Sequence, residues 1–196
     1  MRRRIGRKDE QNTAMQLNKA ELRQRLLQNR KPCPKKDSLI LKNLLSLKEF
    51  KEADLLLTYI STENEIDTCA LINACFERGK KVAVPLCGVH GMTFCEIGSF
   101  SDTEVGKFGI REPLKSCKKV QISNSAFYLC VIPALACNEK GFRIGYGKGY
   151  YDRFLADYKG KSAVLCYSEN IMEFPAEAHD RAADIIITEG GIVYGR

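Results

Sequence analysis

Hydrophobic residues in the first part of the chain recur at the spacing of two helices. Between Leu17 and Arg30, strong helix formers separate apolar residues at positions 17, 22, 26 and 27, and prolines follow at 32 and 34. Because proline has no N–H to donate within a helix, this pattern predicts a first helix over 17–30 that ends before the prolines. A second helix is expected over 36–47, followed by a short turn that runs through Phe50.

The next segments indicate a parallel sheet. The run 53–60 has the length of a buried strand, 66–78 is amphipathic and closes at Gly79, and 81–85 is again apolar. A strand, a helix and a second strand joined by a short return are typical of a βαβ unit. Further strands are expected at 92–97, 127–133, 162–168 and 183–188, and a loop at 99–113. We therefore expect an α/β fold: a single-domain three-layer sandwich with a mainly parallel open sheet and helices on both faces.

Composition narrows the class of protein. With 196 residues, 44% of them hydrophobic and 28% charged, the chain is large enough to form one domain without disulfide support. Its nine cysteines include no C-x-x-C pair, so zinc and a disulfide framework are poorly supported. No apolar run approaches the length of a membrane span, and the start has no apolar segment typical of a secretory signal. We expect a cytoplasmic protein with no membrane partner.

The net charge of +7 is unevenly distributed along the chain. Five basic and two acidic residues fall within the first ten, so the remaining chain carries only +4. Residues 1–14 are polar and without apolar periodicity, and we interpret them as a disordered basic tail in front of a domain over 15–196. A mildly basic domain suits small polyanionic ligands as well as it suits nucleic acid.

A glycine-rich run lies at 141–155, where the sequence reads G-F-R-I-G-Y-G-K-G-Y-Y-D-R-F-L. Four glycines surround Arg143 and Lys148, and the run passes into what we expect to be the start of a helix. Glycine permits positive φ, so backbone N–H groups are free to close around an anion, and a helix N-terminus adds aligned donors. Asp152 offers a hard oxygen ligand for Mg²⁺. The local chemistry therefore indicates ATP with Mg²⁺.

Neither standard nucleotide motif is present in this run. The pattern G-x-G-x-x-G lacks its third glycine at Tyr150, and G-x-x-x-x-G-K-[ST] has Phe142 at its first glycine and Gly149 at its Ser/Thr. A glycine-rich turn between a strand and a helix is also often only a turn. Spacing alone therefore leaves phosphate binding and a structural turn both open.

Further motifs accompany the glycine run along the chain. They are K-A-E-L-R from Lys19, N-E-I-D-T at 64–68, G-I-R-E-P at 109–113, V-I-P-A-L-A before the run, and P-A-E-A-H-D-R-A-A-D-I-I-I-T near the end. Together with the run, they resemble the 5-formyltetrahydrofolate cyclo-ligase family, also called 5,10-methenyltetrahydrofolate synthetase. The resemblance implies a ligase that uses ATP and Mg²⁺ to convert 5-formyltetrahydrofolate into 5,10-methenyltetrahydrofolate. Phosphoryl transfer to the formyl oxygen and ring closure by N10 would release ADP and phosphate.

The resemblance also implies ligand-binding roles for charged residues outside the run. Lys19 and Arg23 fall at i and i+4 on one helix face, where two cations repel each other unless they share an anion. A solvated basic face would explain them equally well, but in the family the matching residues contact the nucleotide phosphates. Glu65 would by itself be an acid near a helix N-terminus, and the resemblance implies that it binds the pterin.

The implied site has four groups of residues. The catalytic cations are expected to be Lys148 and Arg143, because the reaction asks the protein to position two anions and to neutralise the transferring phosphoryl group. ATP is expected to contact Lys19, Arg23, Arg143, Ile144, Gly145, Tyr146, Gly147, Lys148, Gly149, Tyr150 and Tyr151. Folate is expected to contact Ile60, Glu65, Tyr146 and Tyr150, and Mg²⁺ to bind Asp152 and Asp184. The implied partners are 5-formyltetrahydrofolate and ATP, with no nucleic acid, for a monomer or weak homodimer.

Some features stay open. The chain departs from the family at 133–138, where P-A-L-A-C-N replaces the usual P-G-L-A-F-D and leaves the shape of that turn undetermined. The loop at 108–113 has no derived role, and a histidine such as His179 is more often structural than catalytic. Two other functions compete: a nucleic-acid-binding protein that uses the basic tail and the glycine loop, and a dehydrogenase that binds a dinucleotide there. The missing third glycine weakens the dehydrogenase hypothesis.

Overall fold

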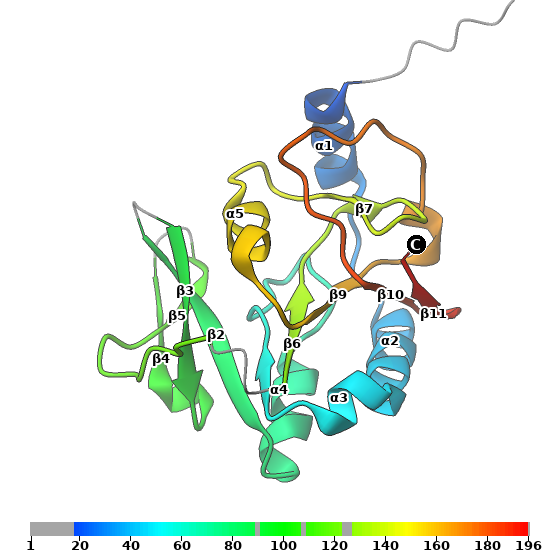
Figure 1. The fold of residues 1–196 in the computed structure, drawn as a ribbon. Coiled ribbons are helices and arrows are strands. Elements are labelled where there is room, and N and C mark those ends of the chain that lie inside the picture. Colours follow the sequence, from blue (N-terminus) through cyan, green and yellow to red (C-terminus); the bar gives the residue numbers. More distant parts are fainter. Residues whose placement is uncertain (1–17, 89–90, 107–108, 123–126, 196) are drawn as a thin grey trace, which may run out of the picture.

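A seven-stranded sheet forms the centre of the protein (Figure 1). The computed structural model describes residues 18–88, 91–106, 109–122 and 127–195, so the tail predicted at 1–14 lies outside the described residues. The strand order is β11-β10-β9-β6-β1-β2-β3. The parallel strands are β1 (Leu55–Leu57), β2 (Lys81–Gly88), β6 (Tyr128–Ile132), β9 (Lys161–Leu165) and β10 (Ile185–Thr188). Antiparallel strands close both edges, β3 (Gly91–Ile97) beside β2 and β11 (Gly191–Tyr194) beside β10.

The central strands are buried on both faces, which explains their continuous apolar sequence. Every residue of β1 and β6 is buried. In the register of the sheet, Leu56 of β1 lies opposite Val82 of β2 and Leu129 of β6. Because neighbouring residues of a strand point to opposite faces, Leu56 belongs to one core cluster and Leu57 to another.

Helices cover both faces of the sheet (Figure 1). One face packs against α2 (Pro34–Ser46), α3 (Lys48–Glu52) and α4 (Cys69–Glu77). The other face packs against α5 (Tyr150–Asp157), whose side chains at 151, 154 and 155 follow helical spacing, and against Tyr158, which caps the helix. The predicted α/β fold, with a mainly parallel open sheet, is confirmed. No helix within the described ranges is long and apolar enough to cross a membrane.

Helix α1 (Lys19–Asn29) lies apart from the sheet and packs against a small hairpin. Its start is set by Asn18, whose Oδ1 accepts hydrogen bonds from the N–H groups of Ala20 and Glu21, both at 3.0 Å. The Glu21 carboxylate returns a bond to the Asn18 N–H at 3.1 Å, which completes a capping box. Leu22 and Leu26 then pack against the hairpin formed by β7 (Ala136–Cys137) and β8 (Arg143–Ile144).

The hairpin of β7 and β8 lies between β6 and the glycine loop, where the sequence analysis expected no strands. The departure from the family at 133–138 belongs to this hairpin, and Asn138 supports its turn. The Oδ1 atom of Asn138 accepts hydrogen bonds from the N–H groups of Lys140 and Phe142, both at 3.1 Å. Gly141 has φ 85°, and a Cβ on it would lie 2.3 Å from the carbonyl oxygen of Ala183. Gly141 therefore serves the turn and its packing, not the loop that follows.

Several other boundaries differ from the predictions. The turn expected through Phe50 is α3, and the strand expected over 53–60 is reduced to β1 because residues 58–61 already leave the sheet. The segment 99–113, expected to be a loop, contains a hairpin of β4 (Thr103–Val105) and β5 (Arg111–Pro113). These strands are too short to show an alternating pattern. The edge strand β11 was missed for the same reason.

Candidate active site

The loop over residues 145–149 connects β8 to the start of α5. Gly147 and Gly149 have φ values of 91° and 66°, which L side chains rarely adopt. Gly149 is the N-cap of α5, and it makes no side-chain capping bond. The first N–H groups of α5 are thus left for another acceptor. This local geometry agrees with the predicted phosphate-binding loop.

Two cations of α1, expected on one helix face from their i, i+4 spacing, contact residues of the loop or of the segment before Arg181. The Nε atom of Arg23 donates to the carbonyl oxygen of Gly145 at 2.8 Å. Its guanidinium lies so close to Gly147 that a Cβ there would be 3.3 Å from Arg23 Cζ. Lys19 forms an ion pair with Asp180, and their side chains are only 11% and 8% exposed. Helix α1 therefore forms one wall of the loop site.

The two predicted catalytic cations have different surroundings. Arg143 is buried, with 4% of its side chain exposed, and its Nη2 lies 3.1 Å from Asp152 Oδ1. Its Nη1 donates to the carbonyl oxygen of Arg181 at 2.9 Å, and the Arg181 N–H donates to Asp152 Oδ1 at 3.1 Å. Lys148 is exposed and has no ion pair with any described carboxylate. Lys148 is therefore free to meet a ligand, whereas Arg143 is held by the protein.

Glu65 and Tyr146, both predicted to bind folate, are neighbours. Glu65 follows the carboxyl end of β1, and its Oε2 accepts hydrogen bonds from the N–H of Thr62 at 2.9 Å and from its hydroxyl at 3.1 Å. Tyr146 belongs to the glycine loop, and Arg30 donates to its hydroxyl at 2.5 Å. Burial raises the pKa of Tyr146, and the adjacent Glu65 carboxylate raises it further. The loop therefore reaches the sheet edge where parallel α/β proteins bind ligands.

The remaining residues predicted for the two substrates divide into exposed and buried groups. The Tyr150 hydroxyl lies 3.5 Å from the carbonyl oxygen of Gly88 at the end of β2, and Arg153 lies over its ring at 5.2 Å. Ile60 is 5% exposed and Ile144 is 0% exposed, and both side chains belong to the core. Among these residues, Tyr150 has the side chain best placed to meet a ligand.

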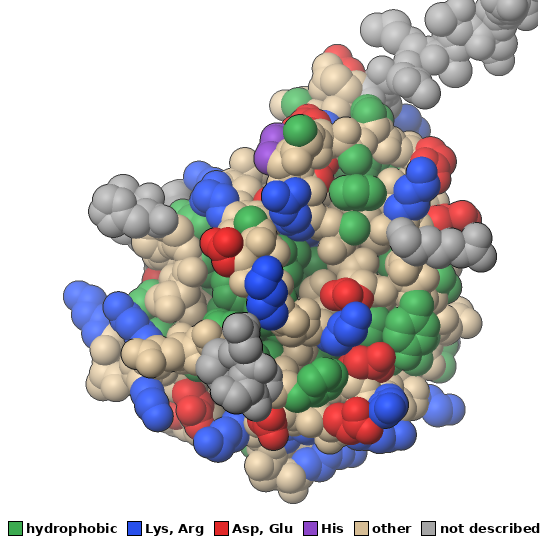
Figure 2. All heavy atoms as spheres, viewed as in Figure 1, with side chains coloured by type: hydrophobic (Ala, Val, Ile, Leu, Met, Phe, Trp, Pro, Cys, Tyr) green, Lys and Arg blue, Asp and Glu red, His purple; other side chains and the backbone are tan. Residues whose placement is uncertain are grey.

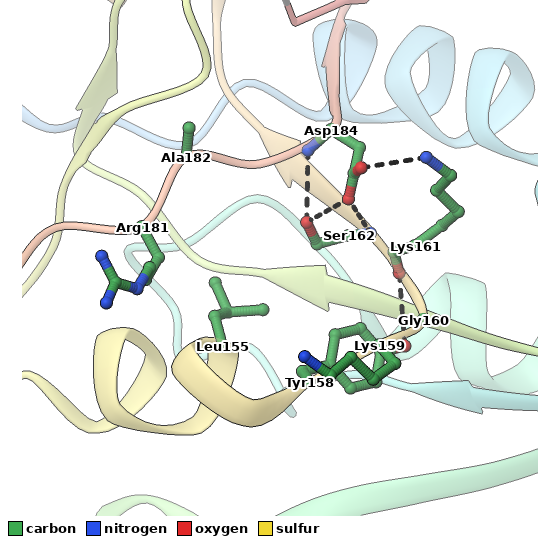
Figure 3. A pocket seen from close by; sticks show the side chains of 9 residues that line it. All are labelled: Leu155, Tyr158, Lys159, Gly160, Lys161, Ser162, Arg181, Ala182 and Asp184. Carbon is green, nitrogen blue, oxygen red and sulfur yellow. Dashed lines mark hydrogen bonds and ion pairs between the residues drawn. The ribbon is translucent and has the colours of Figure 1, made fainter. Parts of the chain in front are cut away.

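Asp184 lies at the amino end of β10, beside a cavity of about 330 Å³ (Figure 3). Its Oδ2 accepts hydrogen bonds from the Ser162 N–H at 2.9 Å and from the Ser162 hydroxyl at 2.8 Å, and its Oδ1 pairs with Lys161 at 3.0 Å. Burial would raise the pKa of Asp184, but these bonds outweigh it and lower the pKa. Asp184 thus has partners other than those of Asp152. It lies at the amino ends of the parallel strands, whereas Glu65 follows the carboxyl end of β1, at the opposite end of the strands.

Asp180 was not predicted from the sequence. Besides its ion pair with Lys19, it accepts a hydrogen bond from the Glu177 N–H at 2.6 Å. Burial would raise the pKa of Asp180, but the bonds from Lys19 and the Glu177 N–H, together with the nearby positive charge, outweigh it and lower the pKa. The carboxylate precedes Arg181, whose N–H contacts Asp152. The sequence signal was its place in the H-D-R-A-A-D segment, where the family resemblance had pointed to Asp184 instead.

Asp180 also belongs to a group of three side chains of the kinds that bind metal ions. The ligand atoms of Glu177, His179 and Asp180 lie within 4.8 Å of one another. His179 Nε2 is 3.2 Å from Glu177 Oε2, and the His179 side chain is 72% exposed. His179 thus contacts acidic groups at the surface next to the Lys19 pair, which leaves its role undefined.

A glycine-rich loop that enters a helix beside a mainly parallel sheet, with cations and carboxylates around it, defines a phosphate-binding α/β protein. Comparison with known proteins identifies the family. A sequence profile of the 5-formyltetrahydrofolate cyclo-ligase family matches residues 15–189, and the chain belongs to that family. The resemblance derived from the motifs is confirmed.

Individual relatives carry matching names. The chain is 29% identical over 173 residues to a probable 5-formyltetrahydrofolate cyclo-ligase of Schizosaccharomyces pombe, across 79% of this chain and 84% of the relative. It is 30% identical over 148 residues to the 5-formyltetrahydrofolate cyclo-ligase of Haemophilus influenzae, across 72% of this chain and 79% of the relative. The NMR structure of Aquifex aeolicus 5,10-methenyltetrahydrofolate synthetase is similar with a TM-score of 0.78 and 28% identity, across 91% of this chain and 93% of that one.

Proposed function

We propose that this protein is a ligase that converts 5-formyltetrahydrofolate and ATP into 5,10-methenyltetrahydrofolate, ADP and phosphate. Membership of the cyclo-ligase family supports this reaction. The observation that carries the proposal is the contact between the Tyr146 hydroxyl and the Glu65 carboxylate. Tyr146 belongs to the glycine loop, and Glu65 follows β1, so one site adjoins both a phosphate-binding loop and the ligand edge of the sheet.

In this reaction the protein forms no covalent bond with the substrates, and its main contribution is to position them. The formyl oxygen attacks the γ-phosphorus of ATP, and ADP leaves with the electrons of the broken P–O bond. N10 of the folate then attacks the activated formyl carbon and loses its proton, the ring closes, and the carbon–oxygen bond breaks with its electron pair leaving on the phosphate. Catalysis of such a transfer rests on alignment and on neutralisation of negative charge. This requirement matches a site rich in cations and backbone donors.

The phosphate contacts fall to the loop and to α1. Lys148 is exposed on the loop, and Arg23 lies against Gly147 with one of its nitrogens bound to Gly145. We assign Lys148 to the transferring phosphoryl group, and the amides of 145–149 with Arg23 and Lys19 to the remaining phosphate oxygens. The buried side chain of Arg143 supports an indirect role for that residue: it holds Asp152 and the start of α5 in place.

The donor set next to the loop suits Mg²⁺, which prefers carboxylate oxygens and keeps the phosphates of ATP as further ligands. When bound, the ion would neutralise charge on the phosphates. Asp152 fits this role because only its Oδ1 is engaged by described residues. The second carboxylate was expected to be Asp184, and that expectation stays a prediction. Asp180 is the better-supported candidate, since it pairs with Lys19 and directly precedes Arg181, whose N–H contacts Asp152.

The folate is assigned to the side of the loop that faces β1 and β2. Glu65 offers a carboxylate to the donor groups of a pterin, and the rings of Tyr146 and Tyr150 offer flat apolar surfaces with polar ends. Ile60 contributes through the buried wall beneath them. The proposed state as a monomer or weak homodimer and the proposed cytoplasmic location remain predictions.

Of the alternatives, nucleic-acid binding finds little support on the face of the molecule shown in Figure 2. Lys and Arg side chains there are interspersed with Asp and Glu and do not form one continuous basic patch. A nucleic-acid binder would also be expected to lose affinity steeply with added salt and to bind without Mg²⁺.

The test is to mix the protein with 5-formyltetrahydrofolate and Mg-ATP and to follow the absorbance of the methenyl product together with ADP. We expect both products to form in equal amounts, and neither to form when ATP or Mg²⁺ is omitted. Product formation without ATP, or ADP release without methenyl product, would overturn the proposal. A nicotinamide cofactor added in place of ATP should show no change in its absorbance, which excludes the dehydrogenase hypothesis.

A further inference from the structure

Helix α5 places two tyrosines against the same face of the sheet, and their hydroxyl groups differ. Tyr151 and Tyr158 are two helical turns apart, and both pack on the core cluster beneath α5. The Tyr158 hydroxyl lies 3.0 Å from the carbonyl oxygen of Tyr128 and 3.3 Å from that of Lys161. The Tyr151 hydroxyl is buried and has no hydrogen-bond partner among the described residues. It is the one buried side-chain polar atom of which this holds within those ranges.

A buried hydroxyl without a partner is unfavourable for folding. It has given up its bonds to water and gained none from the protein, so phenylalanine would fill the same volume without that cost. Such groups in native structures are few and call for an explanation. A ligand that supplies the missing acceptor is one explanation, and the place of Tyr151 in the fold supports it.

The surroundings of Tyr151 belong to the folate side of the site. Burial raises the pKa of Tyr151 well above its usual value, and nearby Cys130, Tyr59, Cys87 and Glu65 raise it further. These residues come from β6, from the segment after β1, and from β2. Arg143, which faces the Tyr151 ring at 6.0 Å, is a cation already held by Asp152. The neutral tyrosine hydroxyl is a hydrogen-bond donor, so a ligand that satisfies it must offer an acceptor atom.

We propose that the Tyr151 hydroxyl donates a hydrogen bond to an acceptor atom of the bound reduced folate, and not to ATP. This inference rests on the proposed function and adds a folate contact to the residue that sequence similarity had placed with the nucleotide. Tyr151 directly follows Tyr150, which is assigned to the folate.

The test compares Tyr151→Phe with the matched control Tyr158→Phe, using the thermal midpoint and the Kd of 5-formyltetrahydrofolate. Tyr151→Phe should leave the midpoint unchanged or raise it, and should weaken folate binding about 3- to 10-fold, the value of one hydrogen bond. Tyr158→Phe should lower the midpoint by about 2–4 °C, because a satisfied bond is lost, and should leave the Kd unchanged. The KM for Mg-ATP should be unchanged in both variants.

Four results would overturn the inference. A midpoint that falls in Tyr151→Phe as it does in the control, with an unchanged folate Kd, would mean that the hydroxyl has a structural partner. A change confined to the KM for Mg-ATP would return Tyr151 to the nucleotide. If the unaltered protein turns over neither substrate, the proposed function fails first and this inference fails with it, whereas an active protein with an unaffected Tyr151→Phe variant refutes only the inference.

Discussion

Arg143 and Asp152 form an ion pair that joins the two ends of the glycine loop. The Nη2–Oδ1 distance is 3.1 Å, and the arginine side chain is 4% exposed. Arg143 lies in β8, the strand directly before the loop. Asp152 lies in the first turn of α5, the helix directly after it. Arg181 completes the connection, since its carbonyl accepts from Arg143 and its N–H donates to Asp152. The flexible glycines are thus held between fixed ends.

The first prediction concerns this ion pair. Arg143→Ala should lower the free energy of unfolding by about 3 kcal/mol, because it leaves the Asp152 carboxylate and the Arg181 carbonyl without their buried partner. Urea denaturation measures the loss, and Asp152→Asn should cost less because the 22% exposed side chain retains some hydration. Unchanged stability with a loss of ATP binding alone would instead make Arg143 a direct phosphate contact.

The second prediction concerns Lys148. Lys148→Ala should lower kcat/KM for Mg-ATP by about 100-fold or more, because the exposed ammonium is the loop cation available to the transferring phosphoryl group. Its unfolding free energy should stay within about 0.5 kcal/mol of the starting protein, since the side chain makes no buried contact. Lys115 is an exposed lysine outside the loop, so Lys115→Ala is the control and should change neither quantity. Full activity in Lys148→Ala would refute its assignment.

The third prediction separates the two candidates for the second magnesium carboxylate. Asp180→Asn should raise the Mg²⁺ concentration needed for half-maximal activity by about tenfold or more at saturating ATP. Asp184→Asn should leave that concentration unchanged and lower stability by about 1–3 kcal/mol, because it disrupts the bonds from Ser162 and Lys161. The opposite outcome would confirm the pair of Asp152 and Asp184 expected from the sequence.

The fourth prediction concerns acid stability and Glu189, which follows β10. Burial would raise the Glu189 pKa, but hydrogen bonds from Ser168 and the Lys36 ammonium outweigh it and lower the pKa from 4.5 to about 2. A folded-state pKa below the unfolded one stabilises the fold above the unfolded value, and this stability is lost as pH falls through the folded value. Unfolding free energy should therefore fall between about pH 5 and pH 2, and less steeply in Glu189→Gln. Equal slopes for the two proteins would contradict the assignment.

Elements with a strong local pattern were predictable from the sequence. The spacing of Leu22 and Leu26 marked α1, the run into Gly79 marked α4, and the glycines before Tyr150 marked the loop and the start of α5. The hairpin of β7 and β8 was missed, because strands of two residues have no period to detect and their turn depends on Asn138.

Contacts between distant positions were beyond local reasoning. Lys19 and Asp180 are separated by 161 positions, and no pattern in either segment indicates that they pair. For the same reason, a cation inside a glycine run does not reveal that Asp152 and Arg181 engage Arg143, and the expected contact of Arg143 with the phosphates stays a prediction. Family resemblance supplied the substrates, and the fold supplied the arrangement of the side chains.

The central claim is that the formyl oxygen of the folate becomes phosphorylated within this site. The most direct measurement uses 5-formyltetrahydrofolate labelled with ¹⁸O in the formyl group, together with unlabelled Mg-ATP, and analyses the released phosphate by mass spectrometry. We predict that one labelled oxygen appears in the phosphate for each methenyl product formed. Unlabelled phosphate, with the label released as water, would contradict the account.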